Sequence, residues 1–330
     1  LNAIKIIDDT KGECAIELNR HQKTTLKSLK WIMIDEYQDF SNLFSELITV
    51  IRKYNNNIRL FCVGDDWQAI NSFAGSDLEY FEEFSQNIEC SGVSSLSINH
   101  RSKSNIVELG NNLMRVKGGT PAKSLKTGGD VIPYFIDDIT INPRNDDDKK
   151  YLILNNHRNN INFDNGFRNA KYVKMCHKII KENMHLICKT ENGKIGVAIL
   201  CRTNAESDRV REILKSCCSS KEILWLRNFD DLIRIGTAHS FKGKEAKIVI
   251  ILNVCNGSFP LIHPDNHLYE IFGQTISKVL DEERRLFYVA ITRAEEKLYF
   301  LTELDNKSGY LTELSMNDYR EARLSTGLSF

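Results

Sequence analysis

The sequence predicts an α/β protein with parallel sheets. Short apolar runs rich in β-branched residues alternate with stretches that have helical spacing. Several runs are almost continuously hydrophobic, such as "AKIVIIL" at 246–252, which is typical of parallel strands covered on both faces. The length of 330 residues is enough for two domains, each with its own core. We therefore expect two parallel sheets, with the boundary between the domains near residues 97–101.

The expected strands and helices alternate along the chain. Strands are expected at 31–34, 59–63, 131–135, 197–200, 222–226, 233–237, 246–252 and 298–302. Helices are expected at 41–54, 77–86, 103–116, 170–184, 204–216 and 281–296. The segment 137–169 is rich in Asn and Asp, so we expect a long loop or an insertion there.

Composition and charge exclude several classes of protein. The chain is 42% hydrophobic and 27% charged with a formal net charge of zero, so any polyanion must be bound through local patches. No apolar run is long enough to cross a bilayer, and no membrane partner is expected. The 9 cysteines include no Cys-x-x-Cys pair, which predicts reduced thiols of a cytoplasmic protein and neither a disulfide framework nor a zinc site.

Two carboxylates follow the first predicted strand. The stretch "WIMIDEYQDF" runs from an apolar strand directly into Asp35 and Glu36. Ligands of open α/β folds sit at the carboxyl edge of the sheet, and in nucleoside-triphosphate hydrolases adjacent acids hold Mg²⁺ and orient the attacking water. The alternative is an acidic helix start, in which Asp39 or Ser41 caps the helix predicted at 41–54.

A second strand end repeats this pattern. The stretch "LFCVGDDWQAINSFAGSD" joins an apolar run to a glycine, two acids and Gln68. If the two strands are neighbours, Gln68 can reach whatever Asp35 and Glu36 bind. Gly-Asp-Asp alone is a common turn, but two such strand ends in succession favour a ligand site over a helix cap.

The motifs along the chain resemble those of superfamily 1 DNA helicases of the UvrD/Rep type, and they follow the family's order. "DEYQD" and "VGDDWQAINSFAGSD" are similar to motifs II and III, "LSINHRSKSNI" to motif IV, and "VAILCRTNAESDRV" to motif IVa. "IGTAHSFKGKEAKIVIIL" is similar to motif V and "DEERRLFYVAITRAEEKLYFL" to motif VI. The Gly-Asp-Asp-Trp-Gln form of motif III is closest to the helicase IV branch.

The resemblance implies an ATP-dependent DNA helicase or translocase that moves 3′ to 5′ on single-stranded DNA and unwinds duplex junctions. The implied fold is a pair of RecA-like cores of the P-loop NTPase type. Residues 1–99 would be the end of the first core (1A), and residues 100–330 a near-complete second core (2A). The stretch between Arg209 and Ile235 is too short for the 2B domain that larger relatives insert. Repair or recombination proteins would be its partners.

The resemblance also assigns roles to individual residues. ATP and Mg²⁺ would lie between the cores, with Asp35 on the metal, Glu36 on the attacking water and Gln68 at the γ-phosphate. Two arginines would reach that phosphate from the second core, because a guanidinium donates two hydrogen bonds and keeps its charge. These arginines are Arg101 and Arg293; Gly243 and Glu245 would also contact the nucleotide, and Phe73, Asn71, Thr237 and His239 would contact DNA.

Several of these residues also have a purely structural interpretation. Outside its motif, Arg101 would be a surface residue at a helix start. Arg293 would form an ordinary ion pair with Glu295 or Glu296. His239 would be a core or surface histidine with its hydrogen bonds satisfied.

The phosphate-binding loop of such a motor is not found in the sequence. That loop is Gly-rich and ends in Gly-Lys-Ser/Thr. Gly-Lys occurs at 193–194 and 243–244, but Ile195 and Glu245 follow. We therefore expect a fragment that lacks the Walker A region and hydrolyses no ATP alone. The alternative is a non-catalytic helicase-like protein that binds DNA or serves as a scaffold.

Overall fold

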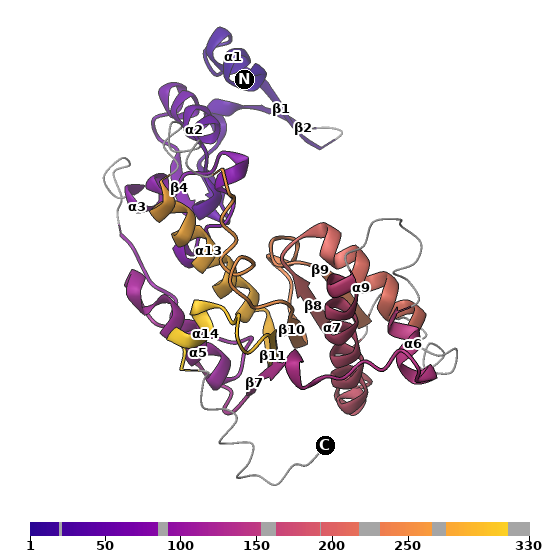
Figure 1. Cartoon of the computed structure of the whole chain (residues 1–330). Coiled ribbons are helices and arrows are strands. Elements are labelled where there is room, and N and C mark those ends of the chain that lie inside the picture. Colours follow the sequence, from indigo (N-terminus) through magenta and orange to yellow (C-terminus); the bar gives the residue numbers. More distant parts are fainter. Residues whose placement is uncertain are drawn as a thin grey trace. The chain divides into compact units, whose positions relative to one another are not determined.

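The computed structural model describes residues 1–19, 22–84, 92–152, 163–191, 193–217, 232–265 and 275–315. The chain divides into two compact units, Leu1–Ser94 and Ser95–Phe330, which we call unit 1 and unit 2 (Figure 1). Each unit is an α/β structure that contains parallel strands. The assignment of residues 1–99 to core 1A and of residues 100–330 to core 2A stays a prediction.

Unit 2 is built around a parallel sheet. Its strands are β7 (Asp130–Phe135), β8 (Ile195–Cys201), β9 (Ile233–Thr237), β10 (Ala246–Ile251) and β11 (Ala294–Thr302). They form a five-stranded sheet in the order β7-β11-β10-β8-β9. Ile250 of the central strand pairs with Ile199 of β8 and with Tyr299 of β11, and it is 0% exposed. Such complete burial is expected for a strand with helices on both faces.

Helices cover both faces of this sheet. The helices α7 (Phe163–Glu182) and α9 (Asn204–Cys217) share one core with Ile199 and Ile250, and Figure 1 shows them along that face. The helices α5 (Ser104–Met114) and α13 (Ile276–Ile291) contact β11, and Leu286 and Phe287 of α13 are fully buried. Smaller elements are β5 (Ile98–Asn99), β6 (Lys123–Ser124), α6 (Asp146–Leu152), α8 (Met184–Ile187) and α14 (Gly309–Glu313).

Unit 1 has a smaller framework. The strands β3 (Trp31–Ile34) and β4 (Arg59–Cys62) form a two-stranded parallel sheet, and α2 (Asn42–Tyr54) connects them. The helix α1 (Asn2–Asp9) packs on α2, and a small core around Ile7, Ile51 and Ile58 holds this side together. The hairpin of β1 (Ala15–Asn19) and β2 (Gln22–Thr25) and the short α3 (Glu79–Glu82) complete the described elements.

The prediction of sheets covered on both faces is wrong for unit 1. Trp31 and Met33 of β3 are 50% and 76% exposed, and Phe61 of β4 is 55% exposed. Successive side chains of a strand point to opposite faces. The core beside α2 takes up only the face that carries Ile32. The face with Trp31, Met33 and Phe61 is therefore open to water.

Two predicted segments are corrected by the structure. The segment 137–169, expected to be a long loop or an insertion, contains α6 and the first turns of α7, so it is not one long loop, whereas the insertion stays a prediction. The acids that suggested a loop stand in the first turn of α6. Carboxylates there are favourable because they complement the helix dipole. The helix predicted at 281–296 is too long, since α13 ends at Ile291 and β11 begins at Ala294.

The remaining predictions have mixed outcomes. The strands at 31–34, 59–63, 131–135, 197–200, 233–237, 246–252 and 298–302 are confirmed within one or a few residues. The helix predicted at 77–86 is described only as the four residues of α3. The strand predicted at 222–226 lies outside the described residues. Among the described helices, none combines the length and the apolar character that a membrane span requires.

Candidate functional site

The carboxyl edge of the sheet in unit 1 carries the predicted acids. Asp35 and Glu36 directly follow β3, and Asp65 comes shortly after β4. Because β3 and β4 are parallel neighbours, these acids come to the same edge. The N–H of Tyr37 donates to the carbonyl oxygen of Val63 at 2.9 Å, which joins the two strand ends.

Glu36 has a left-handed backbone, with φ 52° and ψ 44°. Residues with a side chain seldom adopt this conformation, which costs about 1–3 kcal/mol and is concentrated at functional sites. The N–H of Glu36 donates to Oδ1 of Asp35 at 2.9 Å. The turn therefore bends the chain away from β3 immediately after Asp35 and places both carboxyl groups at the strand end.

Gln38 links the two strand ends, although the resemblance assigns it no role. Its Nε2 donates to Oε2 of Glu36, and its Oε1 accepts the N–H of Asp65 at 2.9 Å. The side chain is 1% exposed. A Cβ on Gly64 would lie 2.7 Å from that Oε1, so this close approach requires glycine. The amide within "DEYQD" is the sequence feature that points to Gln38.

Gln68 and the predicted DNA contacts lie beyond β4. Nε2 of Gln68 donates to Oδ2 of Asp65 at 2.6 Å, so the neighbouring acid orients this amide. Nδ2 of Asn71 donates to Oδ2 of Asp39 at 2.9 Å. Phe73 is 74% exposed. An exposed ring of this kind can stack on a nucleic-acid base.

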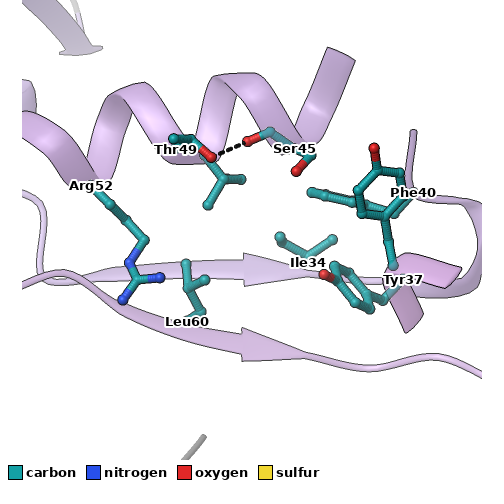
Figure 2. Close-up of a pocket in the computed structure, with 9 residues that line it drawn as sticks. Ile34, Tyr37, Phe40, Ser45, Thr49, Arg52 and Leu60 are labelled. Carbon is teal, nitrogen blue, oxygen red and sulfur yellow. Dashed lines mark hydrogen bonds between the residues drawn. The ribbon is translucent and has the colours of Figure 1, made fainter. Parts of the chain in front are cut away.

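A separate pocket lies beneath α2 in unit 1 (Figure 2). It has a volume of about 460 Å³, with Arg52 at one end and Tyr37 and Phe40 at the other. Burial raises the pKa of Tyr37 to about 12, so its phenol is neutral at physiological pH. The predicted acids Asp35 and Glu36 do not line this pocket.

In unit 2 the predicted nucleotide contacts lie at the amino ends of the strands. Glu245 precedes β10 and Arg293 precedes β11; Lys194, which is not a predicted contact, precedes β8 at the same edge. A pocket of about 530 Å³ opens at this edge, and we call it the amino-edge pocket. Its lining residues are Asn99, His100, Arg101, Lys126, Lys194, Glu245 and Glu295.

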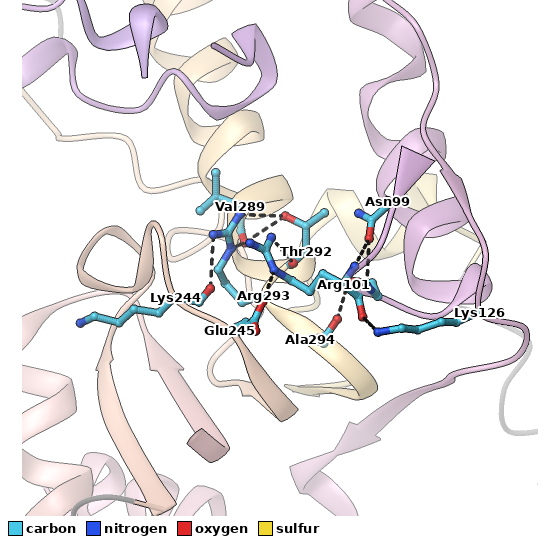
Figure 3. Close-up of polar contacts among 10 residues, drawn as sticks. Asn99, Arg101, Lys126, Lys244, Glu245, Val289, Thr292, Arg293 and Ala294 are labelled. Carbon is cyan, nitrogen blue, oxygen red and sulfur yellow. Dashed lines mark hydrogen bonds and ion pairs between the residues drawn. The ribbon is translucent and has the colours of Figure 1, made fainter. Parts of the chain in front are cut away.

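Arg101 is oriented by several contacts in the amino-edge pocket (Figure 3). Its Nε donates to Oε2 of Glu245 at 2.9 Å, and its Nη1 donates to the carbonyl oxygen of Thr292 at 3.4 Å. Its N–H donates to Oδ1 of Asn99 at 2.9 Å, and its carbonyl oxygen accepts Nζ of Lys126 at 2.8 Å. The side chain is 30% exposed, so an anion can reach the guanidinium.

Arg293 is in a different position, because it is only 1% exposed. Its Nε donates to the carbonyl oxygen of Val289 at 3.0 Å, and its Nη1 donates to that of Lys244 at 3.3 Å (Figure 3). Glu296, one of its predicted ion-pair partners, pairs with Lys103 at 3.4 Å. A phosphate contact would require the buried Arg293 guanidinium to become accessible.

The amino-edge pocket contains charged residues that the sequence does not single out as site residues. Lys126 and Lys194 add positive charge, and Glu295 lies near Glu245. Burial and then the charge of Glu245 raise the pKa of Glu295. A hydrogen bond with Glu191 raises the pKa of Lys194, so the ammonium is charged at neutral pH. Lys194 belongs to the Gly-Lys pair at 193–194, and its place directly before a strand is the feature that could identify it.

The predicted DNA contacts of unit 2 lie at the carboxyl edge of its sheet. Thr237 is the last residue of β9, and His239 follows two residues later. Burial and then the charge of Arg202 lower the pKa of His239 to about 4, so its imidazole is neutral near pH 7. Gly243, with φ 77°, then turns the chain toward β10. The predicted DNA contacts and the predicted nucleotide contacts of unit 2 thus occupy opposite edges of one sheet.

The fold and these two sets of residues define an α/β protein with parallel sheets and two clusters of charged site residues. Residues 14–89 match the UvrD/REP helicase N-terminal domain, and residues 219–304 match the UvrD-like helicase C-terminal domain. Each of the two units thus contains one match to a domain of UvrD/REP-type helicases, and the chain is similar to these helicases.

Individual relatives agree with this assignment. DNA helicase IV of Escherichia coli (strain K12) is 27% identical over 297 residues, which are 89% of this chain and 37% of that protein. The probable DNA helicase of Mycoplasma pneumoniae is 24% identical over 281 residues, 84% of this chain and 44% of that protein. DNA helicase II of Escherichia coli (strain K12) is 31% identical over 98 residues, 30% of this chain and 13% of that protein. The chain thus spans less than half the length of these relatives.

Proposed function

We propose that the chain is part of an ATP-dependent motor that moves 3′ to 5′ along single-stranded DNA and unwinds duplex DNA. One observation carries the proposal. A chain with matches to two helicase domains has Asp35 and Glu36 at the carboxyl edge of the sheet in unit 1, and it has the accessible Arg101 in a pocket at the amino edge of the sheet in unit 2. The scattered thiols support a location in the cytoplasm, and repair or recombination proteins are the partners we propose.

We propose ATP with Mg²⁺ as the nucleotide and metal of this motor. Mg²⁺ at nucleotide sites is usually held by one or two carboxylates together with phosphate oxygens. Asp35 offers such a carboxylate at the end of β3. Within the described residues no group of three or more His, Cys, Asp or Glu gathers, so the donors fit a site shared with phosphates and not a protein-only cage. A bound Mg²⁺ would neutralise charge on the phosphates.

The contacts of the described residues suggest how each would act. Glu36 would accept a proton from the attacking water, and Gln38 would hold its carboxylate in place. Arg101 would exchange Glu245 for the γ-phosphate, because an exposed pair of this kind is weak and a phosphate is the stronger partner. Glu245, once released, could accept hydrogen bonds from the hydroxyl groups of the sugar.

The role of Glu36 is tested by DNA-stimulated ATP turnover of the complete gene product. Glu36→Gln is expected to lower kcat by about 10²–10⁴-fold, the usual contribution of a general base. The matched control is Glu46→Gln, which changes another exposed carboxylate of unit 1 that accepts from Asn42. The control is expected to leave kcat unchanged, and an unchanged kcat for Glu36→Gln would contradict the proposed role.

The 330-residue chain alone is expected to hydrolyse no ATP, because its sequence contains no Gly-Lys-Ser/Thr loop. Turnover by purified chain, measured with and without DNA, checks this expectation. Robust DNA-stimulated turnover would show that other residues replace that loop.

The role of Phe73 is tested by the affinity of the chain for a fluorescent oligothymidine. Stacking of a base on an aromatic ring contributes about 1–3 kcal/mol, so Phe73→Ala is expected to weaken binding about 5- to 150-fold. Phe61→Ala is the control, since Phe61 is also an exposed phenylalanine of unit 1. Equal affinities of the two variants would exclude stacking on Phe73.

A further inference from the structure

A buried ion pair lies at the carboxyl edge of the sheet in unit 2. Arg202 directly follows β8, and its Nη2 donates to Oε1 of Glu283 on α13. The two side chains are only 13% and 8% exposed. Taking two charges out of water is costly, and removal of one partner leaves the other uncompensated. The two side chains therefore depend on each other for their position.

The same glutamate also holds a loop. Oε2 of Glu283 accepts the N–H of Leu261 at 2.8 Å, in the loop that follows β10. The N–H of Arg202 donates to Oε2 of Glu206 at 3.0 Å, at the start of α9. Glu283 thus connects three parts of unit 2: its own helix, the end of β8 and the loop after β10.

Arg202 lies close to one of the predicted DNA contacts. The strands β8 and β9 are neighbours, with Cys201 paired with Thr237, so Arg202 and His239 follow paired residues at one edge. Burial and then the charge of Arg202 lower the pKa of His239, as expected for two side chains that lie near each other at this edge. Within the described residues, Nε of Arg202 is buried without a hydrogen-bond partner.

We propose that Glu283 is a positioning residue for DNA binding, which holds Arg202 beside His239 and fixes the loop at Leu261 to the same edge. The inference rests on the proposed function of the chain in DNA binding. A side chain that is already ordered loses less conformational entropy when a ligand binds. The charge of Arg202 also neutralises the carboxylate, which would otherwise repel a polyanion.

Equilibrium binding of a fluorescent oligothymidine to the 330-residue chain tests this proposal. Glu283→Gln keeps the size of the side chain and an oxygen that can accept from Leu261, but it removes the charge that holds Arg202. We expect binding to weaken about tenfold, as is usual for coupled residues of one network. The matched control is Glu313→Gln, whose partner Arg284 is the next residue of α13 and donates to both Glu313 oxygens at 2.7 and 3.0 Å. The control is expected to bind like the wild type.

A double variant separates positioning from general destabilisation. If Glu283 acts through Arg202, the double variant Arg202→Gln/Glu283→Gln will bind no more weakly than Arg202→Gln alone. Additive losses would overturn the proposal. So would a lower unfolding temperature of Glu283→Gln with an unchanged Kd measured well below that temperature. If the wild-type chain itself does not bind the oligonucleotide, the proposed DNA-binding function fails as well. If the wild-type chain binds the oligonucleotide and the Glu283→Gln variant binds it equally well, only the positioning role of Glu283 is refuted.

Discussion

The two units present their candidate nucleotide-site residues at different edges of their own parallel sheets. In unit 1, Asp35 and Glu36 follow a strand and lie at the carboxyl edge. In unit 2, Lys194 and Glu245 precede strands and line a pocket at the amino edge. The rule that ligands of open α/β sheets sit at the carboxyl edge therefore finds the first set and misses the second. Residues directly before a strand should be searched as carefully as those that follow one.

The two sheets also differ in how they are supported. The central strand of unit 2 is buried at every position except Lys247, whereas β3 of unit 1 exposes every second side chain. The same kind of substitution should therefore have very different effects in the two units, and three experiments compare them.

The largest difference is expected for truncations in the two sheets. Ile250→Ala removes a side chain that is 0% exposed, and such changes usually cost about 2–5 kcal/mol in the free energy of unfolding. Met33→Ala removes one that is 76% exposed, and the expected cost is below about 0.5 kcal/mol. Denaturant unfolding of both variants checks the difference. Similar costs would mean that the open face of β3 is covered in solution.

A smaller effect is expected from the buried imidazole of unit 2. The pKa of His239 falls from its ordinary 6.5 to about 4 on folding, so the unfolded chain binds more protons between these values. Its contribution to stability is complete above pH 6.5 and is lost as the pH falls toward 4, by about 3 kcal/mol. His239→Gln should remove this loss, as measured by denaturant unfolding from pH 7 to pH 4.

The two glutamates that contact Arg202 serve as an internal control for this measurement. Burial raises the pKa of Glu206 and of Glu283, so the protonation of these two carboxylates stabilises the folded state as the pH falls, which is opposite to the effect of His239. This contribution is the same whether or not His239 is present. The charge of Arg202 does not change in this range. The difference between the two stability curves therefore isolates His239, and parallel curves would show that the imidazole is not buried in the neutral form.

The smallest effect is expected where Gly64 closely approaches Gln38 in unit 1. A Cβ on Gly64 would lie 2.7 Å from Oε1 of Gln38 and 2.8 Å from Cε2 of Phe81, so Gly64→Ala should cost about 1–3 kcal/mol. Gly309→Ala is the control, because a Cβ there has open space. The midpoint of denaturant unfolding measures both, and a neutral Gly64→Ala would show that Gln38 can move away from Glu36.

Much of the fold could be predicted because its strands are strongly apolar. The run at 246–252 is hydrophobic at almost every position, which is what a strand between two layers of helices requires. The link between α13 and β11 could not be placed from the pattern. Residues 294–297 read Ala-Glu-Glu-Lys, all good helix formers, so local propensity extends the predicted helix into the first residues of β11.

The candidate site could be predicted in part, because its motifs are local in sequence. Asp35 and Glu36 stand together after one strand, and the strand pairing that would bring Asp65 to them is present. The linking role of Gln38 depends on a contact with a residue of another strand end. Lys126 reaches the amino-edge pocket only through the fold, and no local pattern marks it.

Helix α13 ties the two edges of the sheet in unit 2 to each other. Glu283, near its middle, holds Arg202 at one edge, and Val289, in its last turn, accepts a hydrogen bond from Arg293 at the other. A helix rises about 1.5 Å per residue and behaves as a stiff rod over such a length. The helix α13 thus connects the two edges of the sheet rigidly. We expect that a tilt of α13 would displace both arginines together, because each is hydrogen-bonded to a residue of this helix.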